Sequence, residues 1–129
     1  MATQLNNLDD LISGLQQGLG DAWGQTTILV ATEFGRTVAA NGTGGTDHGT
    51  ASAAMLVGGA VKGGKIVADW PGLAPGDLLD QRDLRPTLGL DALVAHACAE
   101  AFQLDPERTA RVLFPGSTPV TSSARLLRA

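Results

Sequence analysis

The stretch TTILVATEFGRTVAANGTGGTDHGTASAAMLVGG (residues 26–59) contains two apolar runs that flank a glycine-rich segment. The first run, Thr26–Thr32, is apolar and β-branched and lacks the polar alternation of a strand with one wet face. The second run, within Ser52–Val61, is also continuously apolar. Such runs are typical of strands that are covered on both faces, so the sequence predicts two short buried strands.

The segment between the runs, Arg36–Thr50, is predicted to be a loop because glycine, asparagine and threonine dominate it. At roughly fifteen residues it is longer than the usual connection, and loops of that length are usually functional or disordered. Glycine leaves the backbone many conformations to lose on ordering. We therefore expect Arg36–Thr50 to be the most mobile internal segment when no metal is bound.

Helical patterns lie on both sides of this region. Leucine and isoleucine recur at steps of three and four over Leu5–Leu19, and Gly20 is a suitable helix stop. A second apolar stripe spans Leu90–Phe102. A third helix is predicted after Asp105, which can act as its N-cap because a proline takes the first helical position.

Helices beside buried strands indicate an α/β domain. A short edge strand is predicted at Lys65–Asp69, after a Gly-Gly turn, and the proline-punctuated stretch that follows is predicted to be irregular. The chain of 129 residues is long enough for one domain. We expect that domain to span residues 1–116, with residues 117–129 as a tail.

Charge and composition argue against several partners. The formal net charge is −4 and no cluster of lysine and arginine occurs, which argues against nucleic acid and anionic membranes. No run approaches the roughly 18 apolar residues of a membrane span. Cys98 is the single cysteine, so neither an intrachain disulfide nor a thiolate metal site is expected. The N-terminus lacks signal-peptide features, and the compartment stays undetermined.

One acidic residue stands at the end of the first predicted strand. The carboxyl ends of strands in open α/β sheets face the crevice where function concentrates, and Glu33 lies there. A half-buried carboxylate must be hydrogen-bonded, paired or metal-bound. Two interpretations remain open: Glu33 is a metal ligand, or it forms an ion pair with Arg36.

Asp47 and His48 precede the second predicted strand. Carboxylates and neutral imidazoles are ligands for zinc, manganese and related divalent ions. The alternative is local: His48 bonds a nearby backbone group, and Asp47 makes an Asx-turn. His96 lies off the apolar stripe of the Leu90–Phe102 helix and is expected to face solvent, outside any site. No G-x-S-x-G, Walker A or G-x-G-x-x-G motif occurs, so the sequence contains no recognisable nucleophile or phosphate loop.

Six ordered motifs carry a family resemblance: TEFGRT, NGTGGTDHG, GGAVKGGKI, DWPGL, RDLRPT and RVLFPG. In this order they resemble the C-terminal part of domain-of-unknown-function family 1501, whose members are sulfatase-like proteins of the alkaline phosphatase superfamily. Many members carry a twin-arginine export signal. The resemblance implies an α/β fold: a partial parallel-rich sheet covered by helices, the C-terminal part of an alkaline-phosphatase-like domain.

The resemblance also implies roles for individual residues. Glu33 matches the acidic ligand of a divalent-metal site for zinc, manganese or calcium, and His48 matches the late histidine of that site. Asp47 would be a further ligand or would orient His48, and Arg36 would contact an anion. Phe34 stands where the family's relatives have a second histidine ligand. Family members are much longer, so the nucleophile and the remaining ligands are expected outside this chain.

Two functions follow as hypotheses. In the first, the chain is a fragment of a metal-dependent phosphate or sulfate ester hydrolase and holds only part of the metal site. In the second, it is a non-catalytic α/β module with a structural or protein-interaction role. Because the two apolar runs need cover on both faces, we also expect the chain to form homo-oligomers.

Overall fold

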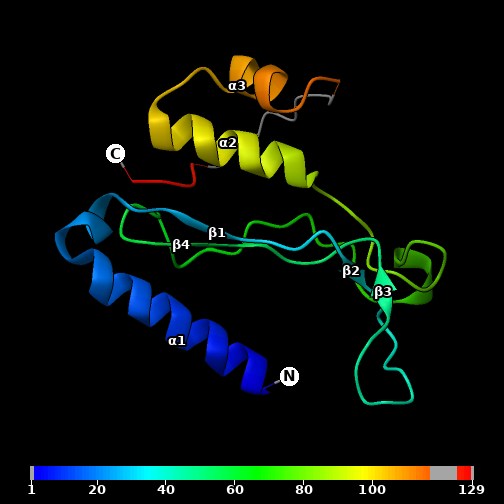
Figure 1. Cartoon of the computed structure of the whole chain (residues 1–129). Helices are drawn as coiled ribbons and strands as arrows, with labels where there is room; N and C mark the ends of the chain where they lie inside the picture. Colours follow the sequence, from blue (N-terminus) through cyan, green and yellow to red (C-terminus); the bar gives the residue numbers. More distant parts are fainter. Residues whose placement is uncertain (1, 117–124, 129) are drawn as a thin grey trace.

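The computed structural model describes residues 2–116 and 125–128 of the chain. In Figure 1 a narrow β ribbon runs between an N-terminal helix on one side and two packed C-terminal helices on the other. The elements follow in this order: α1 (Ala2–Leu19), the 3-10 helix η1 (Gly20–Gln25), β1 (Ile28–Val30), β2 (Gly35–Arg36), β3 (His48–Gly49), β4 (Met55–Val57), the 3-10 helix η2 (Pro75–Asp77), α2 (Leu90–Phe102) and α3 (Pro106–Leu113).

The strands pair only in antiparallel fashion in the described part of the chain. β1 pairs with β4, with Ile28 opposite Val57 and Val30 opposite Met55, and β2 pairs with β3. The predicted parallel-rich sheet is therefore wrong. A parallel pair needs a crossover that returns the chain to the same end of the sheet, usually through a helix. Residues 31–54 instead fold back as the β2–β3 hairpin, so β4 runs antiparallel to β1.

The two apolar runs located β1 and β4 correctly but misjudged their burial. Each strand has three residues, and none of these residues is buried. The expected helical cover on both faces is therefore also wrong. A continuous apolar run indicates that both faces of a strand should be shielded from water. It does not show that helices of the same chain pack against those faces.

Two glycines let the end of β4 pass close to the start of β1. Gly58 has a φ of 139°, and a side chain there would collide with the backbone carbonyl oxygen of Thr26. At Gly59, a Cβ would lie 2.5 Å from the carbonyl oxygen of Trp23, to which the Gly59 N–H donates at 3.1 Å. The tight junction between η1, β1 and β4 thus depends on residues without a side chain.

All three predicted helices are confirmed. Gly20 ends α1 with a φ of 51°, although the chain continues directly into η1. The Asp105 carboxylate accepts the backbone N–H of Arg108 at 2.7 Å, which confirms it as the N-cap of α3. Among the described residues, no helix is both long and apolar enough to cross a bilayer.

The predicted edge strand at Lys65–Asp69 is wrong, because these residues form no strand in the described structure. Pairing occurs just before them instead, where Val61 forms an antiparallel bridge with Leu127. Ile66, in the middle of the predicted strand, is almost fully exposed. The predicted tail spans residues 117–129, of which 117–124 and 129 lie outside the described residues.

The apolar core is small and lies around α2 and α3. No side chain of a described residue is fully buried, and alanine supplies more than half of the buried apolar positions. Alanine contributes little apolar area, so this core offers modest stabilisation for a chain of this length. The buried apolar residues are Val61, Leu78, Ala95, Ala97, Ala99, Ala110 and Leu127.

Replacing Gly58 tests the junction between β1 and β4. We expect Gly58→Ala to lower the free energy of unfolding by about 2 kcal/mol, because its φ is accessible to glycine alone and its Cβ meets the Thr26 carbonyl. Urea denaturation followed by circular dichroism measures the effect. The control is Gly63→Ala, where a Cβ meets nothing within 4 Å. Equal stability of the two variants would contradict the β1–β4 pairing described above.

Candidate functional site

The predicted site residues surround the β2–β3 hairpin. Gly35 lies opposite Gly49 in the ladder, and Arg36 lies opposite His48. A Cβ on Gly35 would collide with the backbone of Thr50, and one on Gly49 would lie 2.6 Å from the carbonyl carbon of Arg36. The facing glycines bring the two backbones closer than side chains would allow, which fixes where Asp47 and His48 leave the hairpin.

A turn far along the chain covers the other side of β2. Leu79 and Asp83 bridge each other, and Asp83 also bridges Thr37, just beyond β2. The Val38 N–H donates to the Arg82 carbonyl oxygen at 3.0 Å, and the Leu84 N–H donates to the Arg36 carbonyl oxygen at 3.3 Å. The hairpin is thus held between its own strands and the 79–84 segment.

Asp83 and Arg82 connect that turn to β3 through their side chains. Asp83 is 8% exposed, and its Oδ2 accepts the Thr50 hydroxyl at 2.9 Å. Its buried Oδ1 accepts no hydrogen bond and lies 3.4 Å from Nη1 of Arg82. Nη2 of the same arginine donates to the His48 carbonyl oxygen at 3.1 Å. The arginine therefore offsets the buried charge and also holds β3 in place.

The His48 ring is oriented by an aromatic contact. Its centroid lies 4.4 Å from that of Phe34, and the two planes differ by 7°. His48 is itself exposed. Phe34, which stands where the family resemblance predicts a second histidine ligand, thus orients the ring of the candidate ligand His48 by stacking on it.

Asn41 organises the loop that carries Asp47. Its Oδ1 accepts the N–H groups of Thr43 and Gly45 at 3.1 and 3.0 Å and the Thr43 hydroxyl at 2.8 Å. Its Nδ2 donates to Oδ1 of Asp47 at 2.9 Å. The Asp47 N–H donates to the Thr37 hydroxyl at 3.1 Å. One oxygen of the Asp47 carboxylate is therefore already engaged with the loop.

Glu33 and Arg36 do not meet as a pair. Glu33 is exposed in the link between β1 and β2, and it forms no ion pair with Arg36 within the described structure. Nη1 of Arg36 instead donates to the Thr46 carbonyl oxygen at 3.1 Å, inside the hairpin loop. The ion-pair interpretation of Glu33 is thus wrong, and Arg36 stabilises the loop that leads to Asp47.

The hairpin does not gather a complete set of metal ligands from this chain. Within residues 2–116 and 125–128, no three side chains of histidine, cysteine, aspartate or glutamate lie close enough to hold one ion. Asp47 and His48 are adjacent in sequence, but a site of three or more ligands would need donors from another chain or region.

Comparison with known protein families agrees with the ordered motifs. Residues 1–113 match the family model described as "Protein of unknown function (DUF1501)". The chain belongs to the DUF1501 family. No curated protein and no solved structure matches this chain. The resemblance noted in the sequence is therefore confirmed for the family, while the sulfatase-like ancestry stays a hypothesis.

Sequence reasoning missed two residues that hold the hairpin in this DUF1501 chain. Arg82 and Asp83 belong to the motif RDLRPT, which carried the resemblance but received no role. The only available sequence signal was the presence of the acidic residue Asp83 in a stretch rich in charged residues and prolines. No local pattern indicates that this stretch returns to β2, because the contact joins residues more than thirty positions apart.

A second polar cluster lies on α2, and here the expectation for His96 is wrong. Its side chain is 14% exposed, and Nε2 lies 2.9 Å from Oε1 of Glu100, one helical turn later. The spacing of four residues was the sequence signal for this pair. His96 was expected to face solvent because its position lies off the apolar stripe of the helix, whereas Glu100 supplies a partner that permits burial.

The Asn41 contacts predict how the hairpin loop responds to substitution. We expect Asn41→Ala to lower the backbone amide order parameters of residues 43–45 below about 0.6, because the hydrogen bonds that the Asn41 side chain accepts from the loop are removed. Relaxation measurements by NMR in the metal-free protein test this. Asn7→Ala, at an exposed position in α1, is the control and should leave the loop unchanged.

The same measurement tests the expected mobility of Arg36–Thr50 in the wild-type chain. Order parameters as high as those of β1 and β4 would show that protein contacts alone hold the loop.

Proposed function

We propose that this DUF1501 chain is a non-catalytic interaction module that functions as a homo-oligomer, with the leucine-rich face of α1 as its contact surface. The single observation that carries the proposal is the uncovered apolar surface of that helix. Leu5 and Leu11 are 58% and 59% exposed, and Leu15 and Leu19 are exposed as well. In Figure 1, α1 lies to one side of the β ribbon and diverges from it toward the N-terminus.

The accessible area supports association with a second copy. The chain exposes 9012 Å², whereas a compact monomer of its mass would expose roughly 6,400 Å². If each of two copies buried half of the excess, the interface would total about 2,600 Å², which lies within the range of obligate homodimers. An amphipathic helix gains most of its stability from packing its apolar face, so α1 also needs such a cover.

Charge determines how this association responds to salt. Each copy has a formal charge of −4, and α1 contains Asp9 and Asp10 but no lysine or arginine. Two copies therefore repel one another, and salt shortens the range of that repulsion from about 30 Å at 0.01 M to about 3 Å at 1 M. An apolar interface between like-charged subunits should strengthen as salt is added.

Sedimentation equilibrium at tens of micromolar tests the proposal. We expect a species larger than the 13.2 kDa monomer, with association that strengthens with ionic strength. The double variant Leu11→Gln/Leu15→Gln should sediment as a monomer because it removes apolar area from α1. The control is Leu73→Gln, a leucine that is 51% exposed outside α1. A well-folded wild-type monomer at this concentration would contradict the proposal.

A second candidate function is participation in phosphate or sulfate ester hydrolysis. It is supported by the position of His48 and Asp47 at an accessible hairpin, beside the guanidinium groups of Arg36 and Arg82. Guanidinium groups suit the oxygens of phosphate and sulfate. In this proposal Glu33, Asp47 and His48 would contribute to a divalent-metal site whose other ligands come from elsewhere, and Arg36 would contact the anion. The chain itself supplies no identified nucleophile.

Turnover of generic phosphate and sulfate esters with added zinc or manganese distinguishes the two functions. If the hydrolase hypothesis holds for the isolated chain, the wild type is active and His48→Ala is inactive. His96→Gln, at the only other histidine, is the control and should retain activity. Turnover that is absent from the wild type, or equal in His48→Ala, would exclude this second candidate for the isolated chain.

A further inference from the structure

Residues 125–128 lie as an added strand beside Ala60–Lys62. The Lys62 N–H donates to the Leu126 carbonyl oxygen at 2.8 Å, and the Arg128 N–H donates to the Ala60 carbonyl oxygen at 2.8 Å. Between them, Val61 and Leu127 form an antiparallel bridge. Nε of Arg128 adds a bond to the Val61 carbonyl oxygen at 3.0 Å. Most of these bonds use the backbone, as in recognition of an extended peptide by a strand edge.

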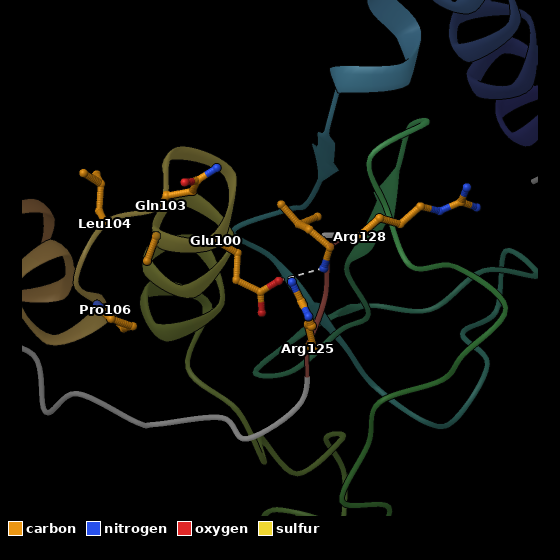
Figure 2. A pocket seen from close by; sticks show the side chains of 8 residues that line it. Glu100, Gln103, Leu104, Pro106, Arg125 and Arg128 are labelled. Carbon is orange, nitrogen blue, oxygen red and sulfur yellow. Dashed lines mark hydrogen bonds between the residues drawn. The ribbon is translucent and has the colours of Figure 1, made fainter.

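A single carboxylate on α2 holds the opposite edge of the segment. Glu100 accepts the Leu126 N–H at 3.0 Å through Oε1 and the Leu127 N–H at 2.7 Å through Oε2. Figure 2 shows this carboxylate turned from α2 toward the segment that carries Arg125 and Arg128. Two successive N–H groups on one anion are charge-assisted hydrogen bonds, which are stronger than neutral ones.

One apolar side chain completes the contact. Leu127 is 4% exposed, which makes it one of the most buried leucines among the described residues. Beside it, a cavity of about 250 Å³ is lined by Glu100, Gln103, Leu104, Pro106 and Leu127, among others. The segment therefore leaves space in the groove that a bulkier side chain could fill.

The titratable group that contacts Glu100 is His96 on α2, whose Nε2 lies 2.9 Å from Oε1, whereas Arg125 and Arg128 of the docked segment line the same cavity. Burial of the carboxylate disfavours its charge, but the N–H groups of Leu126 and Leu127 and the nearby His96 outweigh burial. The pKa of Glu100 consequently lies below its ordinary value of 4.5. The charged, N–H-accepting form is thus the one that prevails in the folded protein near neutral pH.

We propose that the groove between Ala60–Lys62 and α2 is a binding site for an extended peptide, and that Arg125–Arg128 is its resident occupant. The ligand it fits has two successive free N–H groups, a leucine at the second of them and a basic residue next. Because recognition uses backbone groups, one leucine and one arginine of a short segment, the same peptide supplied from another chain should bind when the resident segment is displaced. This inference does not depend on the α1 interface.

Binding in trans is the decisive test. The protein is the full chain with Leu127→Asp, which removes the buried side chain of the resident segment, and the probe is a synthetic Ala-Arg-Leu-Leu-Arg peptide blocked at both ends. We expect saturable shifts of the Ala60 and Lys62 amide signals in NMR spectra. The same peptide N-methylated at its second leucine should bind at least about tenfold more weakly, because that leucine can no longer donate its N–H to Glu100.

Hydrogen exchange of backbone amides tests the role of the Glu100 carboxylate in a chain whose residues 125–128 are unchanged. Glu100→Gln should lower the protection factors of Leu126 and Leu127 at least about tenfold. Glu107→Gln is the matched control, since Glu107 is an exposed helical glutamate that contacts only Arg111 in the described structure. Both variants lose one negative charge, so general electrostatics affects them alike.

The pH dependence has a defined sign. Because the pKa of Glu100 is lowered in the folded state, its contribution to docking is complete above 4.5 and is lost as the pH falls through the lower, folded value. Protection of Leu126 and Leu127 should therefore fall in acid before that of α2. Absence of saturable peptide binding would overturn the proposal, as would unchanged protection of Leu126 and Leu127 in Glu100→Gln, and either result would leave the α1 interface untouched. Tight binding of the N-methylated peptide would also overturn it.

Discussion

The close approach of two backbones at Gly35 and Gly49 is the constraint on which the rest of the structure depends. It closes the hairpin that reverses the chain between the two apolar runs, and this reversal brings β4 back to β1 in antiparallel register. It also gives the 79–84 segment a backbone edge to pair with. A side chain at either glycine would open the hairpin and thereby misplace β4, Asp47 and His48 together.

Outside the hairpin, the fold is held by polar anchors more than by a large core. Asp83 joins a distant turn to Thr50, and Glu100 joins α2 to residues 126 and 127. The buried apolar residues are few and mostly small, whereas α1 leaves its leucines exposed. The hydrogen bonds of Asp83 and Glu100 specify how the segments of the chain pack together. The apolar surface that stays exposed is available for association, which agrees with the proposed interaction module.

The two sites differ in how far the chain completes them. At the hairpin, Phe34 orients His48 and Asn41 holds Asp47, but the described residues do not add a third ligand. In the groove between Ala60–Lys62 and α2, the same chain supplies both the binding groups and the bound segment: Val61 pairs with Leu127, and Glu100 accepts the Leu127 N–H. The proposed peptide groove therefore rests on contacts within the structure, whereas the hydrolase hypothesis requires donors from outside it.

Sequence by itself determined the helices, the N-cap at Asp105, the positions of β1 and β4 and the family, because these depend on local periodicity, capping chemistry and ordered motifs. It also located Asp47 and His48 in the long segment between the strands. Strand direction, the role of Asp83 and the docking of Leu127 were decided only by the tertiary structure. Each of these depends on a partner far away in sequence or on the competition between pairing edges, and no local pattern specifies which distant backbone group a carboxylate or an N–H will meet.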